Sequence, residues 1–292
     1  MTDDAITPTA AKNRMLSVVE QVAARLSATE GRAGPRGMQA SPVHSSEGAG
    51  LVADILPEKL RQHNFLVPGA AANSLSEAFR IAKRHLLVSA LGTVEVPAID
   101  RGRAIVVTSS FPNEGKTFCS INLALALASE KDLEVTLVDG DTVKPEILSL
   151  LGLGGTGGLM DALASGEPPQ RYIIQTSIPN LSVLPAGRRA HDDIELLGSR
   201  QMRAFTEEML AEKPGRILLF DSAPALSASS GPVLAGLCGQ VLMVVRADRT
   251  REEQLADAIR LFGGHRGLQL LLNRTTFSPP GESYGYYYGY ER

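Results

Sequence analysis

The chain has 292 residues, 43% of them hydrophobic, which is enough to build the core of one large domain or two small ones. Its formal net charge of −3 gives no general basic surface for nucleic acid, so we expect no nucleic-acid partner. The N-terminus is acidic, and nowhere do 18 uncharged apolar residues run together. We therefore expect neither a secretory signal nor a membrane-spanning helix, and predict a cytoplasmic protein.

The first 70 residues are predicted to hold one helix and a flexible linker. Apolar residues recur at helical spacing over residues 10–26, whereas residues 30–50 are rich in Gly, Ser and Pro and nearly free of large apolar groups. So short a helix could dock on a partner, dock on the chain's own core, or remain solvated.

A charged helical face is expected next, because Glu77, Arg80 and Lys83 follow one another at a spacing of three. On the residues alone, this face suits a solvated surface as well as an interface.

A phosphate-binding loop is predicted between a buried strand and a helix. The apolar, β-branched run AIVVTS at residues 104–109 is followed by SFPNEGKT at 110–117 and by a helical stretch at 118–129. In such a loop, backbone N–H groups surround a phosphate, the lysine reaches the β- and γ-phosphates, and the hydroxyl binds Mg²⁺. Ser110 stands where the strict motif has glycine, and a chance match is the alternative. The predicted nucleotide contacts are Ser110, Pro112, Asn113, Glu114, Gly115, Lys116, Thr117 and Phe118.

From residue 104 onward, strands and helices alternate. Further strands are predicted at 134–139, 181–186, 216–221, 240–246 and 268–273, and helices at 195–212, 229–237 and 251–262. Strands that are apolar on both faces indicate a mostly parallel sheet covered by helices on each side. We predict an α/β fold of the P-loop NTPase class, with its catalytic domain at residues 71–274.

Three aspartates lie where predicted strands end, namely Asp139, Asp141 and Asp221. Ligands of parallel sheets bind at this edge, where a carboxylate can hold Mg²⁺ or orient a nucleophile. Asp139 or Asp141 could instead cap the helix that follows.

The C-terminal segment 275–292 is predicted to be a flexible tail. Its last nine residues hold five of the chain's six tyrosines, Tyr284, Tyr286, Tyr287, Tyr288 and Tyr290. A phenol attacks a phosphoryl group only when a base or metal helps remove its proton, and a short tether raises the local concentration of phenols. The tail could therefore be the chain's own substrate, or an aromatic segment that binds a partner.

The loop SSFPNEGKT, the segment LVDGD, the strand ending in DSAP and the tyrosine tail together resemble the bacterial tyrosine autokinases of capsule and exopolysaccharide systems, especially the subgroup linked to exosortase-type loci. The resemblance covers about residues 75–292. It implies ATP and Mg²⁺ as cofactors, with Lys116 and Thr117 at the phosphates and metal. Asp139 would be the acid nearest the reacting hydroxyl.

The same resemblance implies that Asp141 and Asp221 serve the metal, although Ala223 stands where the family usually has proline. Residues 77–83 resemble the family's E-x-x-R-x-x-R element, which joins subunits into a ring, with Lys83 in place of the last arginine. Lysine cannot reproduce a bidentate arginine contact. Asn273 resembles the asparagine that contacts adenine in related ATPases, and a strand-end turn is the alternative.

The function implied is ATP-dependent autophosphorylation of the tail tyrosines, which would regulate exopolysaccharide polymerisation and export. The implied partners are other copies of the chain, a separate membrane chain-length regulator (a polysaccharide co-polymerase) and a cognate tyrosine phosphatase, so the protein would lie at the inner membrane through a partner. Two other functions suit the same core: a positioning ATPase of the cell-division or plasmid-partition type, and a non-catalytic scaffold gated by nucleotide. Phe111 stands where positioning ATPases carry an extra lysine.

Overall fold

The computed structural model describes residues 52–189 and 192–275, which all belong to a compact unit that begins at Ala49. The predicted helix at 10–26, the linker at 30–50 and the five tail tyrosines lie outside the described residues. No helix in the described ranges is both long and apolar enough to cross a membrane.

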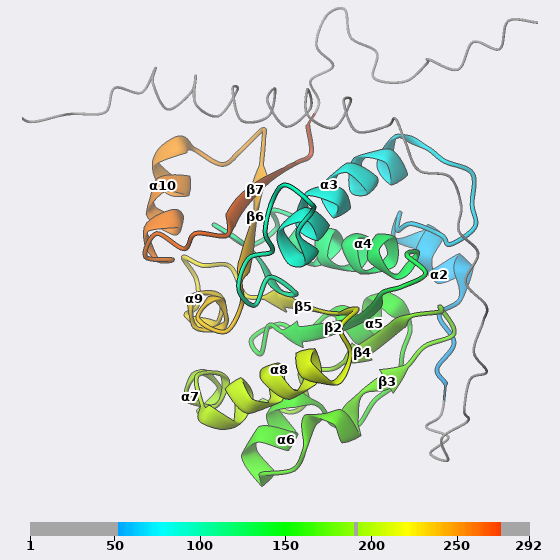
Figure 1. Cartoon of the computed structure of the whole chain (residues 1–292), viewed down its shortest axis with the longest axis vertical. Coiled ribbons are helices and arrows are strands. Elements are labelled where there is room, and N and C mark those ends of the chain that lie inside the picture. The colour runs from blue at the N-terminus through cyan, green and yellow to red at the C-terminus, as the bar shows by residue number, and fades with distance from the viewer. Residues whose placement is uncertain (1–51, 190–191, 276–292) are drawn as a thin grey trace, which may run out of the picture. The chain divides into compact units, whose positions relative to one another are not determined.

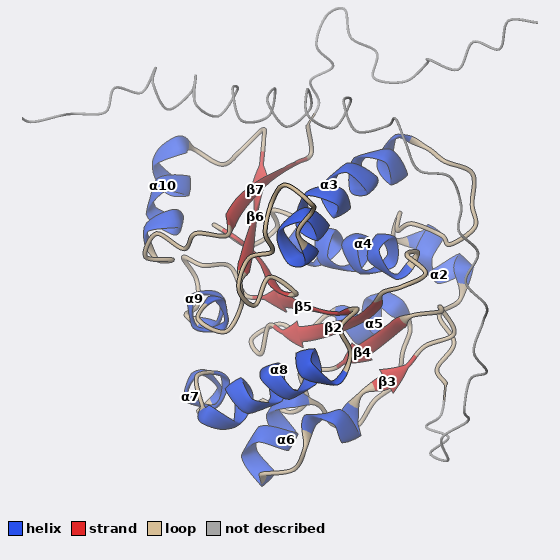
Figure 2. Ribbon diagram, in the orientation of Figure 1, coloured by secondary structure: helices blue, strands red, loops and turns tan. Residues whose placement is uncertain are grey.

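A seven-stranded sheet forms the centre of the unit, with the strand order β3-β4-β2-β5-β1-β6-β7 (Figures 1 and 2). All neighbouring strands are parallel except β3 and β4, which are antiparallel. This confirms the predicted mostly parallel sheet. The strands are β1 (Ala104–Ser109), β2 (Glu134–Gly140), β3 (Ile174–Gln175), β4 (Leu181–Leu184), β5 (Arg216–Ser222), β6 (Gln240–Arg246) and β7 (Leu268–Asn273).

Helices cover both faces of the sheet (Figure 2). The first face packs against α2 (Pro57–Gln62), α3 (Ser74–Leu91), α4 (Lys116–Ala128) and α5 (Ile147–Leu151). The second packs against α6 (Leu159–Ser165), α7 (Asp193–Leu197), α8 (Arg200–Glu212), α9 (Ser230–Ala235) and α10 (Glu252–Arg260). Side chains of β1 alternate between these cores, since Ile105 and Val107 join the first while Ala104 and Val106 join the second.

The predicted helix over 195–212 is wrong as a single element. The chain forms α7 and α8 instead, and Ser199 caps α8 by accepting a hydrogen bond from the Met202 N–H at 3.1 Å. A serine side chain that satisfies the free N–H groups of a helix start favours a new helix over continuation of the old one.

Residues 52–70 pack onto the same unit. Ile55, Leu60 and Phe65 are buried in the first core. Ala53 pairs in parallel with Thr176, just after β3, and the Leu66 N–H donates to Asn122 Oδ1 in α4 at 2.8 Å. The compact unit therefore includes residues that the sequence analysis assigned to the N-terminal segment, ahead of the boundary at residue 70.

Candidate nucleotide-binding site

The phosphate loop connects β1 to α4 at the carboxyl edge of the sheet. Two of its residues have left-handed backbone conformations, Asn113 with φ 67° and Gly115 with φ 97°, so the chain turns sharply before α4 begins at Lys116. The Phe111 N–H donates to Glu114 Oε2 at 2.9 Å and closes the loop. The N-terminus of α4 therefore lies at the same edge of the sheet as the loop. The free N–H groups of this helix start can bind an anion there.

Two strands place their carboxylates beside this loop. Asp139 of β2 and Asp221 of β5 are partners in the parallel register, and each is almost fully buried. Asp221 accepts hydrogen bonds from Thr117 Oγ1 at 2.7 Å and from Ser120 Oγ at 2.9 Å. Strand β5 is therefore tied to the N-terminal part of α4 through the single carboxylate of Asp221.

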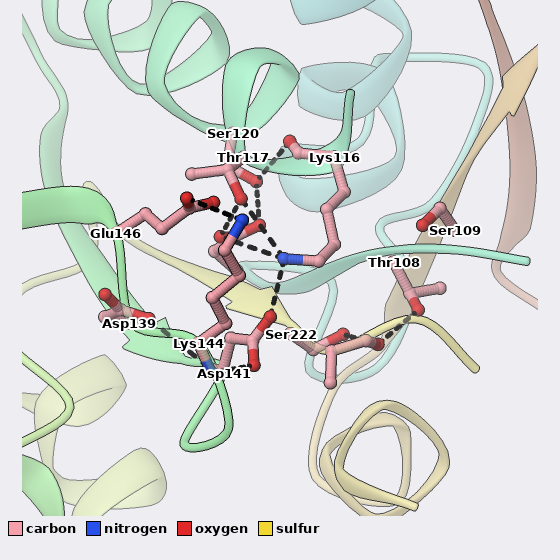
Figure 3. Close-up of polar contacts among 12 residues, drawn as sticks. Thr108, Ser109, Lys116, Thr117, Ser120, Asp139, Asp141, Lys144, Glu146 and Ser222 are labelled. Carbon is pink, nitrogen blue, oxygen red and sulfur yellow. Dashed lines mark hydrogen bonds and ion pairs between the residues drawn. The ribbon is translucent and has the colours of Figure 1, made fainter. Parts of the chain in front are cut away.

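The Lys116 ammonium lies beside the Asp141 carboxylate (Figure 3). Its Nζ is 2.7 Å from Asp141 Oδ2 and 3.7 Å from Asp221 Oδ2. Burial alone would lower the pKa of Lys116, but the Asp221 and Asp141 carboxylates outweigh it and raise the pKa above its ordinary value. Lys116 is therefore a fixed positive charge that a phosphate can share with the aspartates.

Asp139 does not pair with the lysine. Its two oxygens accept hydrogen bonds from the Asp141 N–H at 3.3 Å and the Ile147 N–H at 3.2 Å, so it also holds the first residue of α5. Burial, reinforced by the nearby Asp221 charge, raises the pKa of Asp139 to about 8. The N-cap of α5 is Glu146, so Asp139 contacts the start of α5 without being its N-cap, and a role as base stays a prediction.

The oxygen donors near the loop suit Mg²⁺ chemically. Thr117, Asp141 and Asp221 offer a hydroxyl and two carboxylates, and Mg²⁺ in nucleotide sites typically takes one or two carboxylates and completes its shell with water and phosphate oxygens. No cluster of three or more Asp, Glu, His or Cys with metal-binding geometry occurs among the described residues. Thr117, Asp141 and Asp221 are thus the residues that could hold Mg²⁺ beside the phosphate loop.

Asn273, at the end of β7, contacts the phosphate loop directly. Its Nδ2 donates to the Glu114 carbonyl at 2.9 Å, and a Cβ at Gly115 would lie 2.1 Å from that nitrogen. The Glu114 carboxylate is buried and also accepts a hydrogen bond from Thr250 Oγ1. The predicted contact of Asn273 with adenine stays a prediction, whereas its contact with the loop backbone is present.

Two other predicted contacts have side chains that point elsewhere or remain unpaired. The Phe118 ring packs against Phe65 and Phe79 in the first core, so only its backbone can face a phosphate. The Ser110 hydroxyl is buried and has no hydrogen-bond partner within the described chain. Pro112 and Asn113 are exposed beside the loop.

Comparison with known proteins finds relatives by sequence as well as solved structures with a similar fold. The chain is 27% identical over 197 residues to the tyrosine-protein kinase YwqD of Bacillus subtilis, covering 66% of this chain and 81% of YwqD. It is 29% identical over 162 residues to the tyrosine-protein kinase ptk of Acinetobacter johnsonii, but these span 56% of this chain and only 22% of ptk. Comparison with models of known families finds no match.

Solved structures agree with the sequence relatives. The kinase domain of the Escherichia coli tyrosine kinase ETK superposes with a TM-score of 0.61 at 22% identity, covering 80% of this chain and 94% of that domain. The VpsO kinase domain gives 0.58 at 26% identity, covering 68% and 96%. The chain is therefore similar to bacterial tyrosine-protein kinases in both sequence and fold.

The structure separates the three residues predicted to join subunits of this kinase. Glu77 and Arg80 form an exposed ion pair on α3, with N–O distances of 2.8 and 2.6 Å. Lys83 is buried instead, and its ammonium lies 2.6 Å from Glu130 Oε1 and 3.3 Å from Ser129 Oγ after α4. Lys83 is thus neutralised inside the chain, and its part in a subunit interface stays a prediction.

Sequence reasoning missed two residues that support the kinase site. Ser120 lies three positions after Thr117, so the helical period alone could have placed both hydroxyls on one side of α4. Thr250 follows β6 and carries no motif, and only the folded sheet brings it to Glu114.

Proposed function

We propose that this kinase transfers the γ-phosphoryl group of Mg²⁺-ATP to tyrosines of its own C-terminal tail. The observation that carries the proposal is the convergence of Lys116, Thr117, Asp141 and Asp221 beside the phosphate loop. Phosphoryl transfer depends on positioning and on neutralising charge, and these residues offer both.

Each residue would have a separate role. Lys116 would move from Asp141 towards the β- and γ-phosphates, and Thr117 and Asp221, already joined at 2.7 Å, would exchange their mutual hydrogen bond for the metal and its waters. Mg²⁺ would neutralise charge on the transferred group. Asp139 would accept the proton of the attacking phenol, and its deprotonated form is the one that can do so.

We propose the tail tyrosines as the acceptors of the phosphoryl group on the basis of the amino-acid sequence alone. Strand β7 ends at Asn273, at the same edge of the sheet as the phosphate loop, and Tyr284 follows eleven positions later in the sequence. By the resemblance already described, we further propose that tail phosphorylation regulates exopolysaccharide polymerisation and export. A membrane co-polymerase would hold the kinase at the inner membrane, and a tyrosine phosphatase would reverse the modification.

The intact mass of the purified protein, measured before and after Mg²⁺-ATP, tests this function. We expect mass gains in steps of one phosphate that disappear in Lys116→Ala and on deletion of residues 284–292. Lys131→Ala is the matched control, because Lys131 is exposed beyond the opposite end of α4 and should leave the gains unchanged. Steady ATP hydrolysis without any mass gain would instead support a positioning ATPase.

A further inference from the structure

A basic cavity of about 530 Å³ lies against the outer wall of the phosphate loop. Three arginines line it, Arg246 at the end of β6 and Arg249 and Arg251 in the loop before α10, together with Phe111 and Glu114 of the phosphate loop. We call it the arginine pocket. None of the arginines belongs to the site described above.

The charge of the arginine pocket is only partly neutralised. Arg246 forms a two-pronged ion pair with Asp248, at 2.8 and 3.1 Å. Arg249 and Arg251 are exposed, and neither side chain forms an ion pair within the described chain. Glu114, the only acid that lines the pocket among the described residues, is buried and already accepts hydrogen bonds from Thr250 and the Phe111 N–H. Two guanidinium groups are thus available to an anion.

The tail begins beside this pocket. In the β6–β7 register Arg246 is the partner of Asn273, and the Ala247 N–H donates to the Asn273 carbonyl at 3.0 Å. Tyr284 is ten positions after Arg274, a contour of at most about 36 Å, so a tail tyrosine can approach its own pocket without a second molecule.

We propose that the arginine pocket binds a phosphotyrosine of the C-terminal tail. A phosphotyrosine carries nearly two negative charges, and the planar guanidinium group matches phosphate oxygens in pairs. The Phe111 ring in the pocket wall offers an apolar contact for the phenyl group. The tail of the same chain is the nearest source. This proposal rests on the proposed function, because the tail must be phosphorylated for the pocket to be used.

Occupation of the pocket would retain the product of the reaction against the phosphate loop. Phe111 and Glu114 belong both to the phosphate loop and to the pocket wall. A bound phosphotyrosine would therefore contact residues that fix the conformation of the loop. The pocket would therefore distinguish phosphorylated from unmodified tails.

Peptide binding to the full-length Lys116→Ala protein tests the pocket independently of kinase activity. The probes are synthetic peptides of residues 282–292, fluorescently labelled, either unmodified or with one phosphotyrosine at position 284. We expect the phosphopeptide to bind at least about ten-fold more tightly, and Arg249→Gln combined with Arg251→Gln to remove that preference. Arg266→Gln is the control, because Arg266 is also exposed but precedes β7 at the other end of the strand.

Equal binding of the two peptides, or an unchanged preference in the double arginine variant, would overturn the proposal. Loss of ADP affinity in that variant, with ADP displacing the phosphopeptide, would assign the pocket to the nucleotide instead. The synthetic peptide needs no autophosphorylation, so failure of the pocket and failure of the kinase reaction are distinguished. The phosphotyrosine could come from the tail of the same chain or from that of a second copy, and sedimentation of enzymatically phosphorylated protein distinguishes the two. Association that depends on the arginines and grows with protein concentration would indicate the tail of a second copy.

Discussion

Gly115→Ala tests the contact between the phosphate loop and the end of β7. Gly115 has φ 97°, and an alanine Cβ would lie 2.1 Å from Asn273 Nδ2. A left-handed conformation costs an alanine about 1 to 2 kcal/mol. The Asn273 amide would also have to leave the Glu114 carbonyl, which costs roughly 1 kcal/mol for a neutral hydrogen bond. We therefore expect the free energy of unfolding to fall by about 2 to 3 kcal/mol.

Gly166→Ala is the matched control for this substitution. Gly166 has φ 74° and no atom within 4 Å of the position of a Cβ. Alanine at this position therefore has the strain of a left-handed backbone but no steric clash of its Cβ. We expect it to cost about 1 to 2 kcal/mol, and the difference between the two variants isolates the contact with Asn273.

Urea denaturation followed by circular dichroism at 222 nm measures the free energy of unfolding of both variants. Fluorescence is a poor probe of this fold, because the chain has no tryptophan and five of its six tyrosines belong to the tail. Asn273→Ala should cost about 1 kcal/mol alone and add almost nothing to Gly115→Ala. Strict additivity of these two substitutions, or an equal cost for Gly115→Ala and Gly166→Ala, would refute the reasoning.

Two further predictions concern ion pairs away from the loop. Glu130→Ala leaves the buried Lys83 ammonium with Ser129 alone, so we expect unfolding to become easier by about 1 to 2 kcal/mol, less than for a fully buried pair because Glu130 is half exposed. A change in sedimentation without a change in stability would instead return Lys83 to a subunit interface. At Asp161, burial alone would raise the pKa, but hydrogen bonds from Arg188 and the Gly158 N–H lower it. The stabilisation it contributes is present above the unfolded-state pKa and is lost as pH falls through the lower folded-state pKa, so the cost of Asp161→Asn in urea melts should shrink on acidification, and a cost independent of pH would contradict this assignment.

Much of the sheet could be predicted because its central strands are continuous apolar runs that end in polar residues. The limits of β6 and β7 match the prediction, and Asp139, Asp141 and Asp221 meet at one edge because parallel strands all end there. The elements that were missed are short. Strand β3 has two residues and α5 has five, too few for any hydrophobic period to show.

Long-range contacts between single side chains could not be predicted. Helical spacing put Lys83 on the same side of α3 as Glu77, but it carried no information on Glu130, which follows α4 and neutralises the lysine. In the same way, Asn273 resembled a residue that contacts a base, yet its amide contacts the Glu114 carbonyl. Both contacts depend on how distant segments meet after folding.

Residues 52–70 pack beside the edge strand β3, and this limits where the chain can be shortened. The Ile55 N–H donates to Ser177 Oγ at 3.0 Å, next to the two-residue edge strand β3, while Leu60 and Phe65 fill the first core. A kinase shortened to begin at residue 71 would expose those apolar neighbours and an edge strand that can pair with other chains. A shortened protein for expression, crystallisation or transfer should therefore keep residues 52–70, and forms that lack them are expected to aggregate.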